Sequence, residues 1–130
     1  MILAKTPVRL PLAGGLSDLA GYAARFGGET ISVTIDKHVY VTVKDDLEGT
    51  FDVRYRDTHE HTAEAGQLRH DLLREALRLR RLEGRPIDVD FRVDLAGESG
   101  LGTSGALTVS IVHALARLQG ERPDPWTLLH

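Results

Sequence analysis

The sequence contains no cysteine, and its 130 residues include only one methionine and one tryptophan. Without cysteine, the chain can form neither a disulfide nor a thiolate metal site. No apolar run approaches the roughly 20 residues of a membrane-spanning helix. The apolar run in the first nine residues is also too short for a signal peptide. We therefore expect a cytoplasmic protein that has no membrane partner.

An excess of positive charge is also lacking. The chain carries 16 Lys and Arg residues against 19 Asp and Glu residues, with a net charge of -3 and a pI of about 6.0. Because nucleic-acid surfaces need clustered positive charge, we expect no nucleic-acid partner. Hydrophobic residues make up 42% and charged residues 27%, as in ordinary globular proteins. The length allows one domain with a core but is short for a two-lobed enzyme.

Alternation of apolar and polar side chains predicts strands in residues 2–13, 30–35, 38–43, 51–55 and 87–93. Proline belongs at the edges or bulges of sheets, so Pro7 and Pro11 make the first of these an irregular edge strand. Asp36 and Lys37 lie at the junction of the second and third strands. The polar residues 58–64 predict a loop. The two histidines in that loop lack further ligands nearby, which favours a solvated loop over a metal site.

Apolar residues at helical spacing predict three helices. Ser17 or Asp18 would cap a short helix that runs through about Phe26. The second helix is expected at residues 67–83 and the third at residues 104–118. The resulting order of elements predicts an α+β fold, with a mixed, mainly antiparallel sheet and helices packed on one side.

A glycine-rich stretch between the last strand and the last helix predicts a phosphate site. It runs Ala96-Gly97-Glu98-Ser99-Gly100-Leu101-Gly102-Thr103-Ser104-Gly105. Glycine permits a positive φ and lets the backbone approach a ligand closely. The free N–H groups and the dipole at the start of the following helix favour an anion. The hydroxyls of Thr103 and Ser104 add donors, or an oxygen ligand for Mg²⁺.

Three types of phosphate loop compete for this stretch. A Walker A loop needs a lysine, which is missing here. The spacing from Gly100 to Gly105 fits a dinucleotide loop, but the neighbouring elements are not repeated βαβ units. The third type is the loop of GHMP-family kinases, with the rough pattern Pro-x-x-x-Gly-Leu-Gly-Ser-Ser-x-Ala. The chain resembles it from Gly100 to Ala106, with Ala96 replacing the proline and Thr103 replacing the first serine.

The start of the chain is also similar to that family, in its heptose-phosphate and fucose-directed branch. The matching residues are Arg9, Ala13-Gly14-Gly15 and Ser17-Asp18-Leu19. The resemblance implies that Arg9 is a catalytic residue beside the phosphoryl-transfer site, and that the substrate is bound by Gly14, Gly15, Ser17 and Asp18. An arginine can stabilise charge on the phosphoryl group, and a carboxylate can orient sugar hydroxyls. Without the resemblance, Asp18 is only a helix cap and Arg9 a surface residue.

The resemblance implies that residues 1–130 are the ribosomal-protein-like, ATP-binding amino-terminal domain of a sugar kinase. ATP would be bound by Ser99, Gly100, Leu101, Gly102, Thr103 and Ser104, and Mg²⁺ by Ser104. The phosphoryl acceptor would be a sugar or sugar phosphate, with the anomeric hydroxyl of a heptose phosphate preferred.

Family members are roughly twice this length, and their catalytic aspartate and acidic metal ligand usually lie downstream. We therefore expect the carboxyl-terminal lobe to be absent from these residues and the piece alone to be inactive. The lobe could come from a second chain, or the exposed apolar face could drive self-association. The alternative function is a non-catalytic nucleotide- or sugar-binding module.

Overall fold

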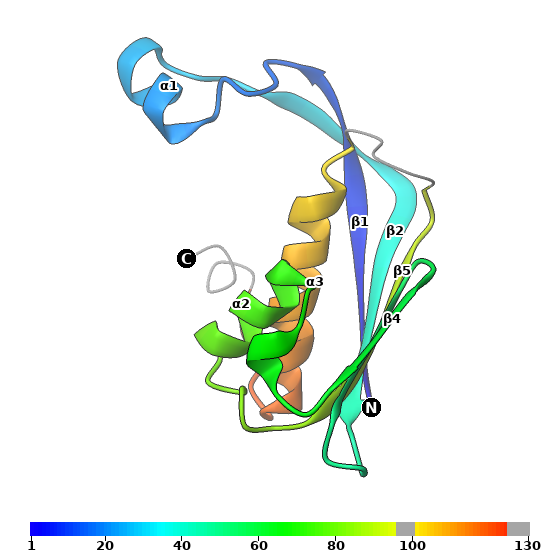
Figure 1. The fold of residues 1–130 in the computed structure, drawn as a ribbon. Coiled ribbons are helices and arrows are strands. Elements are labelled where there is room, and N and C mark those ends of the chain that lie inside the picture. Colours follow the sequence, from blue (N-terminus) through cyan, green and yellow to red (C-terminus); the bar gives the residue numbers. More distant parts are fainter. Residues whose placement is uncertain (96–100, 125–130) are drawn as a thin grey trace.

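The computed structural model describes residues 1–95 and 101–124 and is built on a five-stranded sheet (Figure 1). The strands lie in the order β1-β2-β5-β3-β4. Their bounds are Ile2–Ala13 for β1, Ile31–Asp45 for β2, Phe51–Tyr55 for β3, Thr58–Thr62 for β4 and Ile87–Val93 for β5. Neighbours are antiparallel except for the parallel pair of β3 and β5. The predicted α+β class with a mixed, mainly antiparallel sheet is confirmed.

Strand β1 is the irregular edge strand that its prolines predict. It pairs only with β2, and the register shifts twice, between Pro7 and Arg9 and between Pro11 and Ala13. Proline has no backbone N–H to donate to a neighbouring strand. Each register shift therefore begins at a residue that cannot donate a sheet hydrogen bond. The edge position and both irregularities follow from the sequence.

The prediction of two strands separated at Asp36 and Lys37 is wrong, because β2 is one strand of 15 residues. Pro7 is opposite His38 and Arg9 is opposite Thr34, so three residues of β2 face the single residue Val8. A bulge of this kind absorbs extra residues without ending the strand. The polar pair therefore marks a bulge rather than a turn.

The polar stretch predicted as a loop instead forms the outer strand β4. It follows β3 after a tight turn in which Arg56 has a φ of 51°, and it pairs antiparallel with β3. An edge strand is held by backbone hydrogen bonds and can have polar side chains on both faces. One of these, Glu60, accepts a hydrogen bond of 2.8 Å from the Tyr55 hydroxyl.

Two of the three helices differ from their predicted bounds. Helix α1 (Ala20–Phe26) is not capped by Ser17 or Asp18, since its N-cap is Leu19 and no side chain caps it. Helix α2 covers Asp71–Leu79 rather than residues 67–83. It starts late because a short 3₁₀ helix, Ala65–Gln67, precedes it and the His70 side chain caps it. It ends early near Arg81, which has a φ of 55°.

Helix α3 (Thr103–Leu118) confirms the third predicted helix to within one residue. It packs against β1 and β2, and α2 packs against α3, so both helices cover the same side of the sheet (Figure 1). The core between them consists of alternate strand residues and one face of each helix, including Val39, Val41, Val43, Phe51, Val53, Leu73, Leu77, Ile87, Val89, Ile111 and Leu115. The buried Ser110 hydroxyl donates a hydrogen bond of 2.6 Å to the hydroxyl of the partly buried Thr6.

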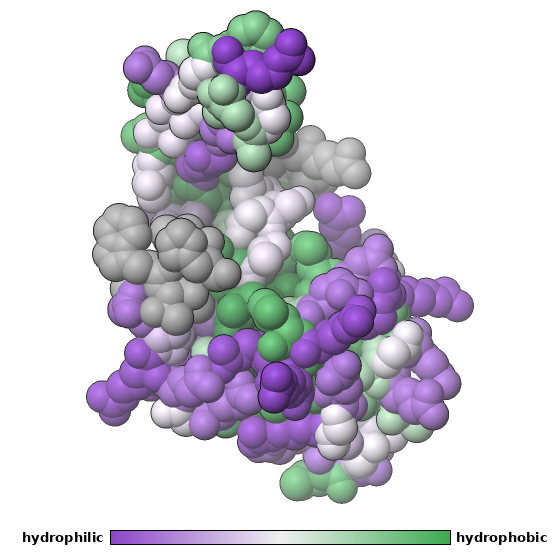
Figure 2. Space-filling model, turned by 90° about the vertical axis from the view of Figure 1, so that its left-hand side faces the viewer, coloured by the Kyte–Doolittle hydropathy of each residue, from purple (hydrophilic) through white to green (hydrophobic). Residues whose placement is uncertain are grey.

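Residues 9–34 form an arm that projects beyond this core. The arm consists of the distal halves of β1 and β2 with α1 between them (Figure 1). None of its residues is buried. Large apolar side chains stand exposed on it, as the green atoms at the top of Figure 2 show, and these include Leu12, Leu16, Leu19, Tyr22, Phe26 and Ile31. Within residues 1–95 and 101–124, no helix is long and apolar enough to cross a membrane.

Candidate functional site

The chain on both sides of residues 96–100 is bonded to the paired strands β1 and β2. Strand β5 ends at Val93, and the next backbone N–H, that of Asp94, donates to the carbonyl of His38 at 3.0 Å. Beyond the gap in the description, the Leu101 carbonyl accepts from the Arg9 N–H at 3.2 Å. The predicted ATP ligands Ser99 and Gly100 lie outside the described residues, as does Ala96.

Gly102 is the N-cap of α3 and lies against the predicted catalytic residue Arg9. Its φ is +69°, in the left-handed region. A Cβ at this position would lie 3.2 Å from Arg9 Cγ and 3.4 Å from Arg9 Nε. The structure therefore brings Arg9, from the first motif, onto the glycine loop of the second motif. The backbone angle favours a glycine here, and a Cβ would also make Arg9 shift by a few tenths of an ångström.

The first turn of α3 carries the other two predicted ligands, Thr103 and Ser104. No side chain caps the helix at Gly102, and the first helical bond inside it runs from the Ala106 N–H to the Gly102 carbonyl at 3.0 Å. The N–H groups of Ser104 and Gly105 precede this bond in the first turn of the helix, where the helix itself supplies no acceptor for them. Together with the helix dipole they can attract an anion at this end.

A cleft of about 980 Å³ opens beside this end of α3. One wall is aromatic. His70 stacks on Phe91 with ring centroids 4.6 Å apart, and it meets Tyr55 edge-on at 4.8 Å. Leu101 and the first turn of α3 line the cleft as well. The cleft therefore joins a flat apolar wall to the helix terminus, which suits a ligand with both a planar ring and an anionic group.

His70 is held in one orientation and kept neutral. Its Nδ1 accepts a hydrogen bond of 3.2 Å from the Leu73 N–H, so the proton of the neutral ring is on Nε2. Burial of the ring lowers the pKa of His70 below its usual value of 6.5. The neighbouring Tyr55 is also fixed, and its hydrogen bond to Glu60 and its burial raise its pKa.

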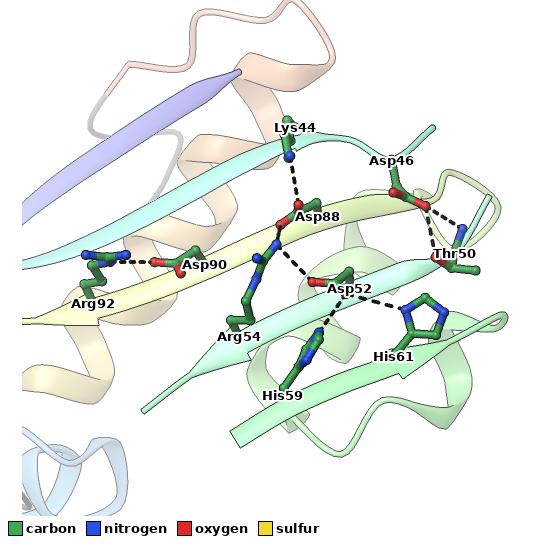
Figure 3. Close-up of polar contacts among 10 residues, drawn as sticks. All are labelled: Lys44, Asp46, Thr50, Asp52, Arg54, His59, His61, Asp88, Asp90 and Arg92. Atoms are coloured by element: carbon green, nitrogen blue, oxygen red, sulfur yellow. Dashed lines mark hydrogen bonds and ion pairs between the residues drawn. The ribbon is translucent and has the colours of Figure 1, made fainter. Parts of the chain in front are cut away.

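Three arginines, Arg54, Arg56 and Arg92, are among the residues that line the cleft. Arg92 pairs with Asp90 at 2.9 Å, and Arg54 pairs with Asp88 at 2.7 Å (Figure 3). Arg56, in the turn between β3 and β4, also lines the cleft and has no ion-pair partner within the described part of the chain. Among the described residues, Arg56 is therefore the arginine of the cleft that makes no ion pair.

On the outer face of the sheet, the two histidines of β4 converge on Asp52 of β3 (Figure 3). His59 Nε2 is 2.7 Å and His61 Nδ1 is 3.5 Å from the same oxygen, Asp52 Oδ2. Partial burial would raise the pKa of Asp52, but these hydrogen bonds and Arg54 outweigh it and leave that pKa lowered. Across residues 1–95 and 101–124, no group of three or more histidine, cysteine, aspartate or glutamate side chains could hold a metal ion.

The predicted substrate residues lie on the arm, apart from the start of α3 (Figure 1). A Cβ at Gly14 would come 1.8 Å from the Glu29 carbonyl oxygen, so this position admits only glycine. The Ser17 hydroxyl hydrogen-bonds to the Gly14 carbonyl at 2.7 Å and the Glu29 carbonyl at 2.9 Å, which closes the same turn. Gly15 and Asp18 are exposed beside it. Gly14 and Ser17 therefore shape this turn, and Asp18 is left accessible to a ligand.

The aromatic wall of the cleft is not predicted by the sequence. Tyr55 and Phe91 stand out only as apolar positions of two strands, and His70 falls inside a predicted helix. They meet because β3 and β5 pair in parallel with Tyr55 opposite Phe91. To predict this wall, the parallel pairing of β3 and β5 would have to be known, and no local pattern in the sequence indicates it.

No protein-family model matches the chain, and no curated protein matches it either. Solved structures do match. A D-glycero-D-manno-heptose 1-phosphate kinase from Bacteriodes thetaiotaomicron is 26% identical, with a TM-score of 0.84 over 98% of this chain and 45% of that chain.

Two further structures share the fold at lower identity. The mevalonate kinase of Methanococcus jannaschii is 15% identical, with a TM-score of 0.73 over 98% of this chain and 43% of that one. A phosphomevalonate kinase from Streptococcus pneumoniae, in complex with phosphomevalonate and AMPPNP, is 20% identical, with a TM-score of 0.71 over 95% and 39%. The chain spans less than half the length of each of these three structures.

Proposed function

Because the solved structures that match this chain are GHMP-family kinases, we propose that residues 1–130 are the ATP-binding amino-terminal domain of a sugar kinase. The reaction transfers the γ-phosphoryl group of ATP to a sugar hydroxyl. The acceptor that we propose is the anomeric hydroxyl of a heptose phosphate or a related sugar. The observation that carries the proposal is Arg9 lying across Gly102, beside a cleft of about 980 Å³.

The cleft and the start of α3 fit the two parts of ATP. The adenine ring would lie against the wall formed by Tyr55, His70 and Phe91, since flat apolar rings stack well. The phosphates would lie at Gly102, where the missing side chain lets them reach the backbone N–H groups of the first turn. The cleft volume is in the range typical of small-molecule sites.

Each residue predicted to bind ATP then has its own role. Leu101 and Gly102 bring backbone groups to the phosphates, and Thr103 and Ser104 add hydroxyls. Arg9 neutralises charge that develops on the transferring phosphoryl group. Ser99 and Gly100 belong to the same proposed loop but lie outside the described residues.

Mg²⁺ is proposed as the partner of the ATP phosphates, whose charge it would neutralise. It prefers oxygen ligands and usually keeps several of its waters. Ser104 could give one hydroxyl oxygen, while the described residues contain no cluster of carboxylates and histidines for a metal.

The sugar would be oriented by Asp18, with Gly14, Gly15 and Ser17 forming the turn that presents it. The Asp18 carboxylate is exposed and can accept hydrogen bonds from two hydroxyls. This part of the proposal is supported by the likeness to a heptose 1-phosphate kinase at 26% identity. The cytoplasm, where ATP is made, is the compartment that we propose.

The test has two stages. Calorimetry measures ATP binding to the chain, and a coupled assay measures ADP release by the whole protein with heptose phosphates, hexose phosphates and free sugars. Binding with sugar-dependent ADP release supports the kinase. Binding without any turnover by the whole protein favours the alternative, a nucleotide-binding module without catalysis. If ATP does not bind at all, the kinase and a nucleotide-binding module are both refuted, which leaves only the sugar-binding form of the alternative.

A further inference from the structure

Asp94 is the first residue after β5 and the last but one before the gap at residues 96–100. It is bonded to β2 through both its backbone and its side chain. The Asp94 N–H donates to the His38 carbonyl at 3.0 Å, and the His38 N–H donates to Asp94 Oδ2 at 2.9 Å. This pair of bonds forms a closed link between the two residues. The chain that leaves β5 is therefore fixed to β2 at Asp94.

A third contact stabilises the same carboxylate oxygen. The Tyr40 hydroxyl donates to Asp94 Oδ2 at 3.3 Å. Burial and the Asp94 carboxylate together raise the pKa of Tyr40, so the phenol keeps its proton and remains a donor. The His38 ring is also near, with Nδ1 3.7 Å from Asp94 Oδ2. One oxygen thus accepts two hydrogen bonds and faces an imidazole.

The point on β2 to which Asp94 is tied is itself unusual. His38 is opposite Pro7 of β1, directly after the bulge formed by residues 35–37. Two residues after Pro7, the Arg9 N–H donates to the Leu101 carbonyl. The chain on both sides of residues 96–100 is therefore held by one short section of the β1–β2 pair. Bulges are common next to active sites, where they redirect the chain.

We propose that Asp94 is a positioning residue: it holds β2 at His38, beside the section of β1 whose Arg9 holds Leu101, and thereby sets the affinity of Gly102, Thr103 and Ser104 for nucleotide phosphates. The inference rests on the proposed ATP site. Asp94 does not touch the ligand in this proposal, and it acts through His38 and the β1–β2 pair. A binding loop that is not held in place must be ordered by the ligand, which costs affinity.

The chain offers a closely matched control in Asp46. Its Oδ2 accepts from the Thr50 N–H at 2.8 Å and from the Thr50 hydroxyl at 3.0 Å, so it makes the same two kinds of bond. It lies in the turn between β2 and β3, away from the glycine-rich stretch. Asp94→Ala and Asp46→Ala should therefore have similar effects on stability, while only the first should affect the loop.

The experiment is calorimetric titration of the chain with ATP, with chemical denaturation of each variant alongside. We expect Asp94→Ala to weaken ATP binding by at least about fivefold, and Asp46→Ala to leave it within about twofold of wild type. Asp94→Asn keeps an oxygen that can accept both bonds, so it should restore binding to within about twofold. An Asp94→Ala variant that binds ATP like wild type overturns the proposal, and so does an Asp94→Asn variant as weak as Asp94→Ala.

A second measurement covers the case in which Asp94→Ala does not fold. Tyr40→Phe removes one hydrogen bond to Asp94, and Thr50→Val removes the corresponding bond to Asp46. Hydrogen exchange at the amides of Gly102, Thr103 and Ser104 should become faster in Tyr40→Phe and stay unchanged in Thr50→Val. Equal exchange in both variants overturns the proposal.

The proposed function can fail separately. If Gly102→Ala weakens ATP binding and Asp94→Ala does not, the ATP site stands and only the positioning role is lost. If the wild-type chain does not bind ATP, the proposed function is refuted and the role of Asp94 falls with it.

Discussion

Replacing Gly102 by alanine tests the site at the point where its two motifs meet. The substitution has two separate effects. It places an L-residue at a φ of +69°, and it adds a Cβ 3.2 Å from Arg9 Cγ. The first effect strains the backbone, and the second displaces a side chain that is proposed to be catalytic. A useful experiment must measure the two separately.

Gly49 provides the control, because it isolates the backbone effect. Its φ is +82°, and nothing lies within 4 Å of the Cβ that alanine would add. Gly49→Ala should therefore cost about 1–2 kcal/mol in unfolding free energy from the left-handed conformation alone. Gly102→Ala should cost about the same, because the Arg9 side chain is exposed and can move by the few tenths of an ångström required.

The two variants should differ in ligand binding rather than in stability. The added methyl group occupies the place where the phosphates are proposed to approach the backbone. We expect Gly102→Ala to lower ATP affinity by about tenfold or more, equivalent to ~1.4 kcal/mol, and Gly49→Ala to leave it unchanged. Denaturation and calorimetry on the same samples provide both numbers. If Gly102→Ala binds ATP as tightly as Gly49→Ala, the phosphates do not lie against Gly102 and the proposed site is wrong.

Three further predictions concern other parts of the molecule. Asp18→Asn should lower kcat/KM for the sugar about tenfold in the whole protein while KM for ATP changes little, because charge-assisted bonds are about twice as strong as neutral ones; wild-type kinetics would leave Asp18 without a sugar role. Ser110→Ala should lower the unfolding free energy by about 1–2 kcal/mol, because it leaves the Thr6 hydroxyl unpaired. Adding Thr6→Val to this variant should lower it by less than about 1–2 kcal/mol more, and additive losses in denaturation would contradict the hydrogen bond. His70, whose pKa is lowered by burial, binds a proton more readily in the unfolded chain, so stability should be complete above about pH 6.5 and decline below it. His70→Asn keeps a capping side chain but not this titration, so its unfolding free energy should fall less between about pH 7 and about pH 5, and equal slopes would contradict the assignment.

The sequence predicts those elements whose own side chains decide their structure. The alternation in β3 and β5 and the long apolar periodicity of α3 were sufficient, and the prolines of β1 located both register shifts. The resemblance to GHMP-family kinases, based on Arg9, Asp18 and the glycine loop, is confirmed by the solved structures that match. It also linked two motifs that the fold brings into contact at Arg9 and Gly102.

The remaining features depend on tertiary contacts that no local pattern records. Strand β4 is polar because an edge strand needs only backbone pairing, so it has no hydrophobic signal. Polar residues favour both turns and bulges, so Asp36 and Lys37 do not distinguish the bulge in β2 from a turn. The cleft wall depends on the register that places Tyr55 opposite Phe91. In each case, the decisive partner is on another segment of the chain.

The arm has a consequence for how the molecule opens. Residues 9–34 include no buried side chain, so their hydrogen bonds are not protected by packing. The free energy that resists local unfolding comes mainly from buried contacts, and here these lie between α3, α2 and the remainder of the sheet. Amides of α1 and the distal parts of β1 and β2 should therefore exchange through fluctuations that leave the core intact. We therefore expect two cooperative units, with Arg9, beside Gly102, at the boundary between them.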